Sequence, residues 1–384
     1  MASPLPHTLK KGRGAASNSL SQRFDRIARE ADGDWLDHEL QGDSDVTLAG
    51  GAEGDRALTL SPASKRADVA ARTSVDLETP RTAITRNQSP DVPFDRSINA
   101  YRGCEHGCIY CFARPTHAYL GLSPGQDFET RLTAKPSVPA LLERELANPN
   151  YRCAPMALGT NTDPYQPIEA RYRITRGILE VLDRCGHPVT ITTKSARVLD
   201  DIGVLTRMAE RRLAVVMMSV TSLDPATARI MEPRASAPAR RLAAIRELSA
   251  AGIPCHVSVS PVVPGITDHE IEAILEAAAE AGATGAFSLV VRLPHEVAPL
   301  FREWLAVHYP DRADKVMHLI QGMRGGKDND ARFFERYRPK GAYAATLKAR
   351  FEKKKRQLGL GRARMDLRTD LFDPSTLTGQ GRLF

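Results

Sequence analysis

The sequence of 384 residues lacks any run of about 18 apolar residues, the length that a membrane-spanning helix needs. Its start, Met-Ala-Ser-Pro-Leu-Pro-His, lacks the continuous apolar core of a secretory signal. Its six cysteines lack the paired pattern of a disulfide framework. We therefore expect a cytoplasmic protein in a reducing compartment, without a membrane partner. The length suits one large domain of about 200 to 250 residues with extensions.

Large apolar residues are scarce in the N-terminal part of the chain, which is rich in Ser, Gly, Ala, Asp and Arg. This composition predicts a poorly ordered extension over residues 1–90, with a short helix at about 20–31. Residues 76–99 contain three prolines and are expected to form an extended strap that leads into the core. We place no catalytic residue in this region.

Basic residues are concentrated near the other end and account for much of the formal net charge of +7. Between Met323 and Thr369 they greatly outnumber the acidic residues, and they include the run Lys-Lys-Lys-Arg at 353–356. Such asymmetry is typical of a protein with a polyanion partner, such as a nucleic acid. Alternatively, residues 342–357 form an exposed helix with solvated charges. The nearby aromatic residues would either stack on bases or anchor the extension; they are Phe333, Phe334, Tyr337 and Tyr343.

Three cysteines, Cys104, Cys108 and Cys111, lie together in the segment Cys-Glu-His-Gly-Cys-Ile-Tyr-Cys, and no fourth cysteine follows nearby. A structural zinc ion or a closed iron–sulfur cluster normally has four protein ligands. Three thiolates therefore predict a metal centre with an open position. The alternatives are a zinc knuckle completed by His106 or His117, and a redox-inert structural cluster. No Cys or His pair follows at zinc-finger spacing, which disfavours zinc.

The spacing C-x3-C-x2-C, with Tyr110 before the third cysteine, resembles the cluster loop of the radical S-adenosylmethionine (AdoMet) superfamily. The resemblance implies that the three cysteines hold three irons of a 4Fe-4S cluster and that the fourth iron binds AdoMet. It also implies reductive cleavage of AdoMet to a 5'-deoxyadenosyl radical, which abstracts a hydrogen atom from the substrate. An external one-electron donor of the flavodoxin or ferredoxin type would reduce the cluster. We expect a monomer.

Short apolar runs alternate with longer amphipathic stretches between residues 97 and 294, a pattern that predicts βα units around a parallel sheet. The predicted strands are 97–101, 154–158, 189–193, 214–220, 254–260 and 285–292. The predicted helices are 138–147, 175–185, 201–211, 240–251 and 268–281, with Gly186, Gly252 and Gly282 at C-cap positions.

Six βα units are too few for a closed eight-stranded barrel. The resemblance implies instead an α/β fold with a partial (β/α)6 TIM-type barrel as the radical AdoMet core, at residues 91–295. A basic, mainly helical C-terminal extension at 296–384 would pack on the barrel. Barrel enzymes carry their active sites at the C-terminal strand ends, and the cysteine loop directly follows the first predicted strand.

Polar residues follow the next predicted strands. The family generally contacts the AdoMet amino group after the second strand, which implies roles for Thr160, Asn161 and Asp163, although Asn-Thr-Asp-Pro is also ordinary turn chemistry. Lys194, after the third strand, would pair with the AdoMet carboxylate. Ser219, at the end of the fourth strand, would meet the carboxylate or ribose, as would Thr221. The alternative for Lys194, Ser219 and Thr221 is that they are solvent-exposed residues that only cap the ends of their strands.

Apolar residues around the turn Pro264-Gly265 resemble the adenine contact of the same family; they are Val259, Val262 and Ile266. A turn followed by a helix N-cap explains this segment equally well. Tyr110 would cover the edge of the adenine.

Residues 97–343 resemble the DNA-repair-photolyase-like group, which includes spore photoproduct lyase. The supporting segments are Asn99-Ala100-Tyr101-Arg102-Gly103, Thr162-Asp163-Pro164, Thr193-Lys194 and Arg324-Gly325-Gly326. The lyase needs a cysteine near its second strand end to return a hydrogen atom, but this chain has Gly159 and Thr160 there. The nearest thiol, Cys153, precedes the strand, which puts spore photoproduct repair itself in doubt.

Two arginines are the candidate substrate contacts. Arg292 ends the sixth predicted strand, where a guanidinium suits a carboxylate or phosphate, and Arg234 lies in the loop after the fourth strand, where a surface salt-bridge cluster is the alternative. The sequence thus predicts a radical AdoMet enzyme with a nucleic-acid or nucleotide substrate. The alternative is a non-catalytic iron–sulfur or zinc protein that binds nucleic acid or senses redox state.

Overall fold

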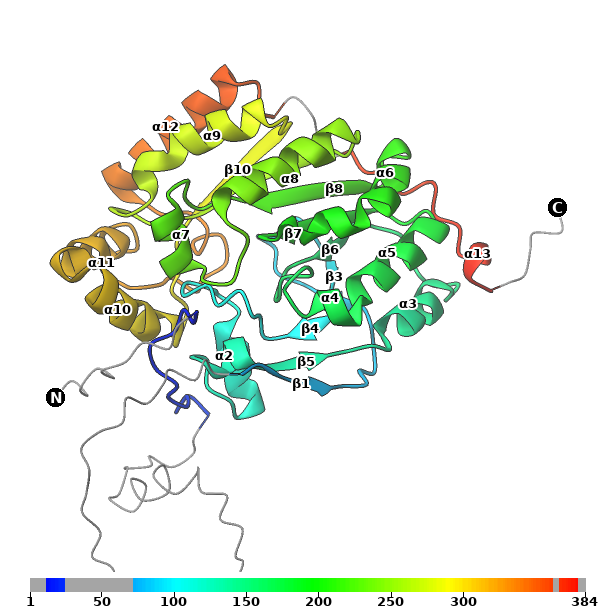
Figure 1. Cartoon of the computed structure of the whole chain (residues 1–384), viewed down its shortest axis with the longest axis horizontal. Coiled ribbons are helices and arrows are strands. Elements are labelled where there is room, and N and C mark those ends of the chain that lie inside the picture. Colours follow the sequence, from blue (N-terminus) through cyan, green and yellow to red (C-terminus); the bar gives the residue numbers. More distant parts are fainter. Residues whose placement is uncertain (1–11, 25–71, 362–365, 379–384) are drawn as a thin grey trace, which may run out of the picture.

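The computed structural model describes residues 12–24, 72–361 and 366–378, and it has a mixed α/β fold. Its main sheet has seven strands (Figure 1). In spatial order they are β10 (Gly285–Val290), β9 (Cys255–Val262), β8 (Ala214–Ser219), β7 (Val189–Thr193), β6 (Met156–Leu158), β3 (Arg96–Ile98) and β2 (Thr85–Arg86). The six strands from β10 to β3 are parallel, as the alternating pattern predicts, and β2 is antiparallel at the β3 edge.

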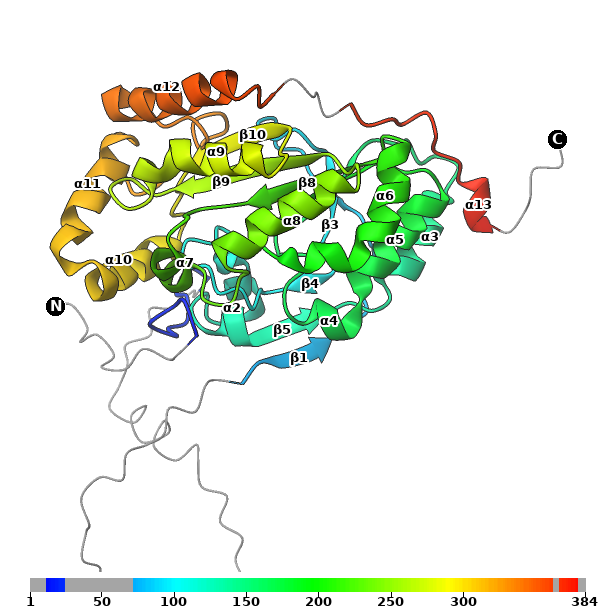
Figure 2. The same ribbon diagram turned by 45° about the horizontal axis from the view of Figure 1, so that its top comes forward.

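Helices cover one face of this sheet (Figures 1 and 2). They are α3 (Val138–Leu146), α5 (Ile174–Arg184), α6 (Ile202–Glu210), α8 (Pro238–Ala250) and α9 (Ile271–Glu280). All five were predicted, with ends that differ by a few residues, because each has a clear apolar stripe at helical spacing. The predicted caps Gly186, Gly252 and Gly282 have φ values of 66°, 74° and 97°, which confirms that the helices end there.

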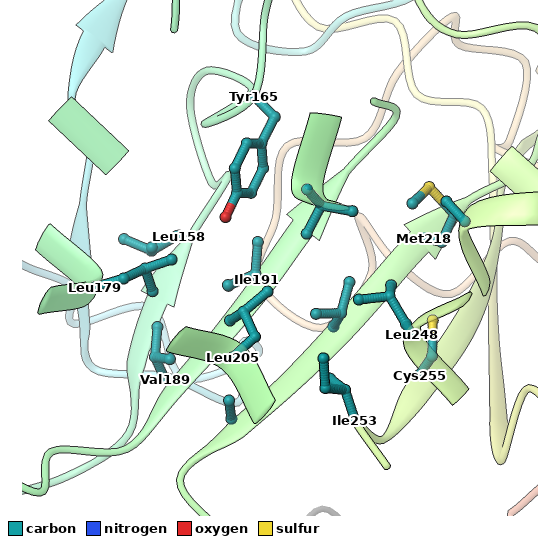
Figure 3. Packing of buried hydrophobic residues seen from close by; sticks show 14 of the residues in the cluster. Leu158, Tyr165, Leu179, Val189, Ile191, Leu205, Met218, Leu248, Ile253 and Cys255 are labelled. Carbon is teal, nitrogen blue, oxygen red and sulfur yellow. The ribbon is translucent and has the colours of Figure 1, made fainter. Parts of the chain in front are cut away.

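The main core lies between the sheet and these helices (Figure 3). Along β7, Val189 and Ile191 face the helices and are fully buried, whereas Thr190 and Thr192 lie on the opposite face. Met217 on β8 and His256 on β9 lie on the same face as Thr192, because the strand register aligns Thr192 with Met217 and Met217 with His256. At these positions the face of the sheet opposite the helices is therefore more polar than the helix-covered face.

A second sheet was not predicted. It contains β1 (Ser74–Leu77), β5 (Arg131–Ala134) and β4 (Tyr101–Arg102), in that order. The predicted strand at 97–101 is split, because the chain leaves the main sheet after Ile98 and pairs Tyr101 with Ala134 instead. With η1 (Arg114–Leu120) and α2 (Asp127–Thr130), this sheet supports the cysteine loop from one side.

The C-terminal region is mainly helical and contains α10 (Val297–His308), α11 (Ala313–Gly322), α12 (Gly341–Gln357) and α13 (Ser375–Thr378). α12 lies along α9 (Figure 2) and buries Leu347 and Phe351. Arg350 donates to Glu272 on α9 at 2.7 and 2.6 Å, so its charge is paired with a neighbouring helix. Within the described ranges, no helix is long and apolar enough to cross a membrane.

Within the N-terminal extension expected at 1–90, the structure describes residues 12–24 and 72–90, and the rest of that expectation lies outside the described residues. The described parts are packed against the α/β domain, and the strap at 76–99 contains the end of β1 together with β2 and β3. Residues 20–24 of the predicted helix are not helical, and the remainder of that helix lies outside the described residues. Composition alone missed this because many contacts of 12–24 use backbone groups and small or polar side chains, with Phe24 against Tyr119 as a large apolar contact.

Candidate cofactor site at the strand ends

The cysteine loop, residues 104–111, connects β4 to η1 and packs against the segments that follow the main-sheet strands. The Cys104 amide donates to the carbonyl of Phe128 at 2.9 Å, and the Ile109 amide donates to the carbonyl of Met231 at 3.1 Å. Cys104 and Cys108 are each only 7% exposed, and Cys111 is partly buried. The backbone of the loop is thus fixed from two sides.

The three thiols lie within electrostatic range of one another. Burial raises the pKa of Cys104, and the negative charges of Asp163, Cys108 and Cys111 raise it further. Burial also raises the pKa of Cys108, to about 12. Among the described residues, no three His, Cys, Asp or Glu side chains converge closely enough to hold a single metal ion.

The histidines of the zinc alternative have other contacts. His106 is buried, and its Nδ1 lies 3.3 Å from a carboxylate oxygen of Asp163. His117 is also buried, with its Nε2 3.0 Å from the carbonyl oxygen of Arg131. One ring nitrogen of each histidine is thus engaged by another protein group.

Arg114, at the start of η1, holds the backbone of the cysteine loop in place. The sequence did not reveal this role of Arg114. Its Nε donates to the carbonyl of Cys108 at 2.9 Å, and its Nη2 donates to that of Gly107 at 3.1 Å. The guanidinium also pairs with Glu129 at 2.5 Å, and both side chains are fully buried. One fully satisfied guanidinium therefore sets the position of two loop carbonyls.

The segment after β6 ties the cysteine loop to β7. The Thr160 hydroxyl and the Asn161 amide both contact Oδ1 of Asn99, at 3.3 and 3.1 Å. The carboxylate of Asp163 accepts hydrogen bonds from the Thr193 hydroxyl at 2.7 Å and from the Lys194 amide at 2.8 Å. Asp163 thus mainly links the segment after β6 to the end of β7.

The pKa of Asp163 reflects these contacts. Burial alone would raise it, but the charge and hydrogen bond of His106, with the donors of Lys194 and Thr193, lower it to about 2. The carboxylate therefore stays ionised.

A buried polar network lies on the other side of the loop. Glu232 accepts hydrogen bonds from the hydroxyls of Tyr110 and Thr221, the latter at 2.8 Å, and pairs with Arg241. Arg241 also donates to the carbonyl of Ser219 at 3.0 Å. The structure thus brings together three predicted site residues, Tyr110, Ser219 and Thr221, through the buried ion pair of Glu232 and Arg241. These two residues follow the fourth predicted strand near Arg234, but they were not among the predicted cofactor contacts.

Lys194 provides a cation beside this network. Its Nζ lies 5.8 Å from the centroid of the Tyr110 ring. Burial alone would lower the pKa of Lys194, but the charges of Cys108 and Glu232 raise it above its usual value. The ammonium therefore remains protonated next to the cysteine loop, where it suits an anionic group.

The three candidate adenine contacts separate in the structure. Ile266 is 5% exposed and belongs to the apolar cluster that contains Cys108 and Tyr110. Val259 and Val262 belong instead to the core between sheet and helices. Because side chains alternate along a strand, Ser258 and Ser260 lie on the opposite face from Val259.

The two candidate substrate arginines also differ. Arg234 is held against the cysteine loop: its Nη2 donates to Glu105 at 3.0 Å, and its amide donates to the carbonyl of His106 at 3.2 Å. Arg292 follows β10, and its guanidinium carbon lies 4.6 Å from the centroid of Tyr337. Its buried Nε has no hydrogen-bond partner within the described structure. Arg292 therefore keeps a buried donor for a ligand, whereas one guanidinium nitrogen of Arg234 is already engaged by the cysteine loop.

Cys153 lies before β6, at the opposite end of the strand from Gly159. It is partly buried, and burial raises its pKa to about 11. The structure therefore brings no thiol from the second strand end toward the cysteine loop.

An α/β fold with a parallel sheet and a three-cysteine loop at its strand ends defines the class of protein. The chain belongs to the radical SAM superfamily, whose family model matches residues 98–278. An uncharacterized protein of Mycobacterium bovis is 40% identical over 232 residues, which cover 60% of this chain and 68% of that protein. An uncharacterized protein of Methanocaldococcus jannaschii is 24% identical over 173 residues, or 45% of this chain and 62% of that one.

Solved structures of spore photoproduct lyase share the fold. The complex with a dinucleoside spore photoproduct has a TM-score of 0.53 at 16% identity, covering 79% of this chain and 86% of the lyase. A variant with bound AdoMet and the dinucleoside has the same TM-score and coverage at 15% identity. The superfamily implies a 4Fe-4S cluster and AdoMet as cofactors.

Proposed function

We propose that this protein is a radical AdoMet enzyme in which Cys104, Cys108 and Cys111 hold three irons of a 4Fe-4S cluster. When bound, the cluster and AdoMet supply reductive cleavage to a 5'-deoxyadenosyl radical, which abstracts a hydrogen atom from the substrate. The observation that carries the proposal is the set of three neighbouring thiols beside a protonated lysine. An external flavodoxin- or ferredoxin-like donor would provide the electron to a cytoplasmic monomer.

The open parallel sheet is, in this proposal, a partial (β/α)6 barrel at 91–295 with extensions at 1–90 and 296–384. Lys194 would bind the AdoMet carboxylate. Glu232 would orient Tyr110, because it accepts that hydroxyl's hydrogen bond, and Ile266 would exclude water beside it. Thr160 and Asn161 would position the amino group through the Asn99 contact.

We further propose a nucleotide or nucleic-acid substrate. A ladder of alternating cations and rings extends from the end of β10: Arg292 lies over Tyr337, and Arg336 lies 5.0 Å from the centroids of both Tyr337 and Phe333. Phe333 is 53% exposed. Arg336 is paired with Asp91 at 2.6 Å, so Arg292 is the guanidinium of this ladder that suits a phosphate, and the exposed ring suits a base. Spore photoproduct lyase structures that share the fold include complexes with a dinucleoside spore photoproduct.

Catalysis is tested by anaerobic reconstitution with iron and sulfide, followed by AdoMet and dithionite. The wild-type protein should release 5'-deoxyadenosine, and Cys108→Ala should not, because its cluster would lose a ligand. A protein that binds iron yet releases no 5'-deoxyadenosine under any reducing condition would be a structural or sensing protein instead.

Substrate class is tested separately by fluorescence anisotropy with a labelled oligonucleotide at several salt concentrations. Tyr337→Leu and Arg292→Ala should weaken binding, and Arg292→Ala should reduce the salt slope by about one. Arg350→Ala is the matched control, because Arg350 is paired with Glu272. Equal binding by all variants would remove the ladder from the proposed substrate site.

A further inference from the structure

Residues 12–24, which we name the N-terminal clamp, lie directly against the cysteine loop although more than eighty residues of sequence separate them. The clamp is the dark blue segment beside α2 and α10 (Figures 1 and 2). The amides of Gly14 and Ala15 donate to the two carboxylate oxygens of Glu129, each at 2.9 Å. Glu129 is the buried partner of Arg114. The clamp is therefore linked through one ion pair to the carbonyls of the cysteine loop.

The clamp and the loop approach more closely than side chains permit. A Cβ atom at Gly14 would lie only 1.8 Å from the carbonyl oxygen of Gly107, the residue before Cys108. Gly107 itself has a φ of +66°, and a Cβ there would lie 2.7 Å from a Glu129 carboxylate oxygen. The close contact between the clamp and the cysteine loop therefore requires glycine at positions 14 and 107, in addition to the backbone turn at Gly107.

Further contacts hold the part of the clamp that follows Gly14. Ala15 is 1% exposed and belongs to the apolar cluster of Cys108 and Tyr110. Asn18 and Asp127 exchange two hydrogen bonds, at 3.0 and 2.8 Å. Further along, Arg23 lies 3.4 Å from Glu296, next to the start of α10. The clamp therefore passes over the loop from α2 to α10.

We propose that the N-terminal clamp is a positioning element for the cluster ligands: it sets the cysteine loop through Glu129 and Arg114 and excludes water and oxygen from the side of Cys108. Its role in cluster protection rests on the proposed function. Its role in ordering the loop does not depend on the proposed function, because the contacts that order the loop are made between protein groups alone.

Two measurements on full-length Gly14→Val test the proposal. In the metal-free protein, amide hydrogen exchange of residues 103–113 should become roughly tenfold faster, because local opening becomes easier. In reconstituted protein, the cluster absorbance should decay several-fold faster in air. Gly203→Ala is the matched control, since a Cβ at Gly203 meets nothing within 4 Å. It should leave both measurements unchanged.

Asn18→Asp provides a milder second variant, because it sets a negative charge against Asp127 without placing an atom in the loop. It should give a smaller effect in the same direction. If both variants keep wild-type exchange over 103–113, the clamp does not order the loop and the proposal fails. If exchange rises but the cluster's lifetime in air is unchanged, the clamp does not protect the cluster. If amide hydrogen exchange becomes faster in the variants but the wild-type protein does not cleave AdoMet, only the enzyme assignment is refuted.

Discussion

The buried ion pair between Arg114 and Glu129 gives the sharpest stability prediction. Both side chains are fully buried, and Arg114 also donates to four backbone carbonyls, those of Gly107, Cys108, Pro124 and Gly125. Arg114→Met would leave the Glu129 carboxylate buried without its cation. Removing one partner of a buried pair costs about 3 to 5 kcal/mol. This is a large part of a typical total stability of about 5 to 15 kcal/mol.

Urea unfolding of the metal-free protein, followed by circular dichroism, measures this loss. Arg207→Met is the control, because Arg207 is 57% exposed and pairs with Asp183 at the surface. That substitution should cost less than about 1 kcal/mol. If Arg114→Met unfolds at the same urea concentration as Arg207→Met, the ion pair does not support the cysteine loop in the way we infer.

Three further predictions concern other parts of the molecule. Burial lowers the pKa of His187 to about 4. The unfolded chain, with a histidine pKa of about 6.5, therefore binds the extra proton first, and stability should fall as the pH drops from 6.5 to 4. His187→Gln should lose less stability over that window than wild type, with the exposed His318→Gln as control; equal losses would contradict the pKa shift. Cys153→Ala should retain AdoMet cleavage, because Cys153 lies at the far end of β6; loss of cleavage with an intact cluster would show that this thiol has another role. Lys194→Met should weaken AdoMet binding at least tenfold while iron content is unchanged, and unchanged affinity by equilibrium dialysis would remove Lys194 from the cofactor site.

The parallel sheet was predictable because each of its units carries a local signal. β7 was predicted with its observed bounds, since Val-Thr-Ile-Thr-Thr alternates buried and exposed positions. The split after Ile98 was not predictable, because it depends on pairing with β5, some thirty residues away in the chain. Strand-end placement indicated Lys194 and Ser219, and the cysteine motif indicated Tyr110, but neither signal could show which groups these residues contact.

The residues missed around the site share a physical cause. Arg114 pairs with Glu129 and Glu232 pairs with Arg241, 15 and 9 residues apart in the chain, and single charged residues carry no periodic signal that would predict such buried pairs. The N-terminal clamp was missed because glycine and alanine indicate a flexible tail when only composition is considered. Here their small size permits a close backbone approach.

The most direct test of the account is electron paramagnetic resonance of the reduced, anaerobically reconstituted protein before and after AdoMet is added. The account predicts the spectrum of a reduced 4Fe-4S cluster that changes when AdoMet binds to the iron without a protein ligand, and Cys108→Ala should lose the signal. A reduced cluster whose spectrum is unaffected by saturating AdoMet would contradict the central claim that this loop leaves one iron free for the cofactor.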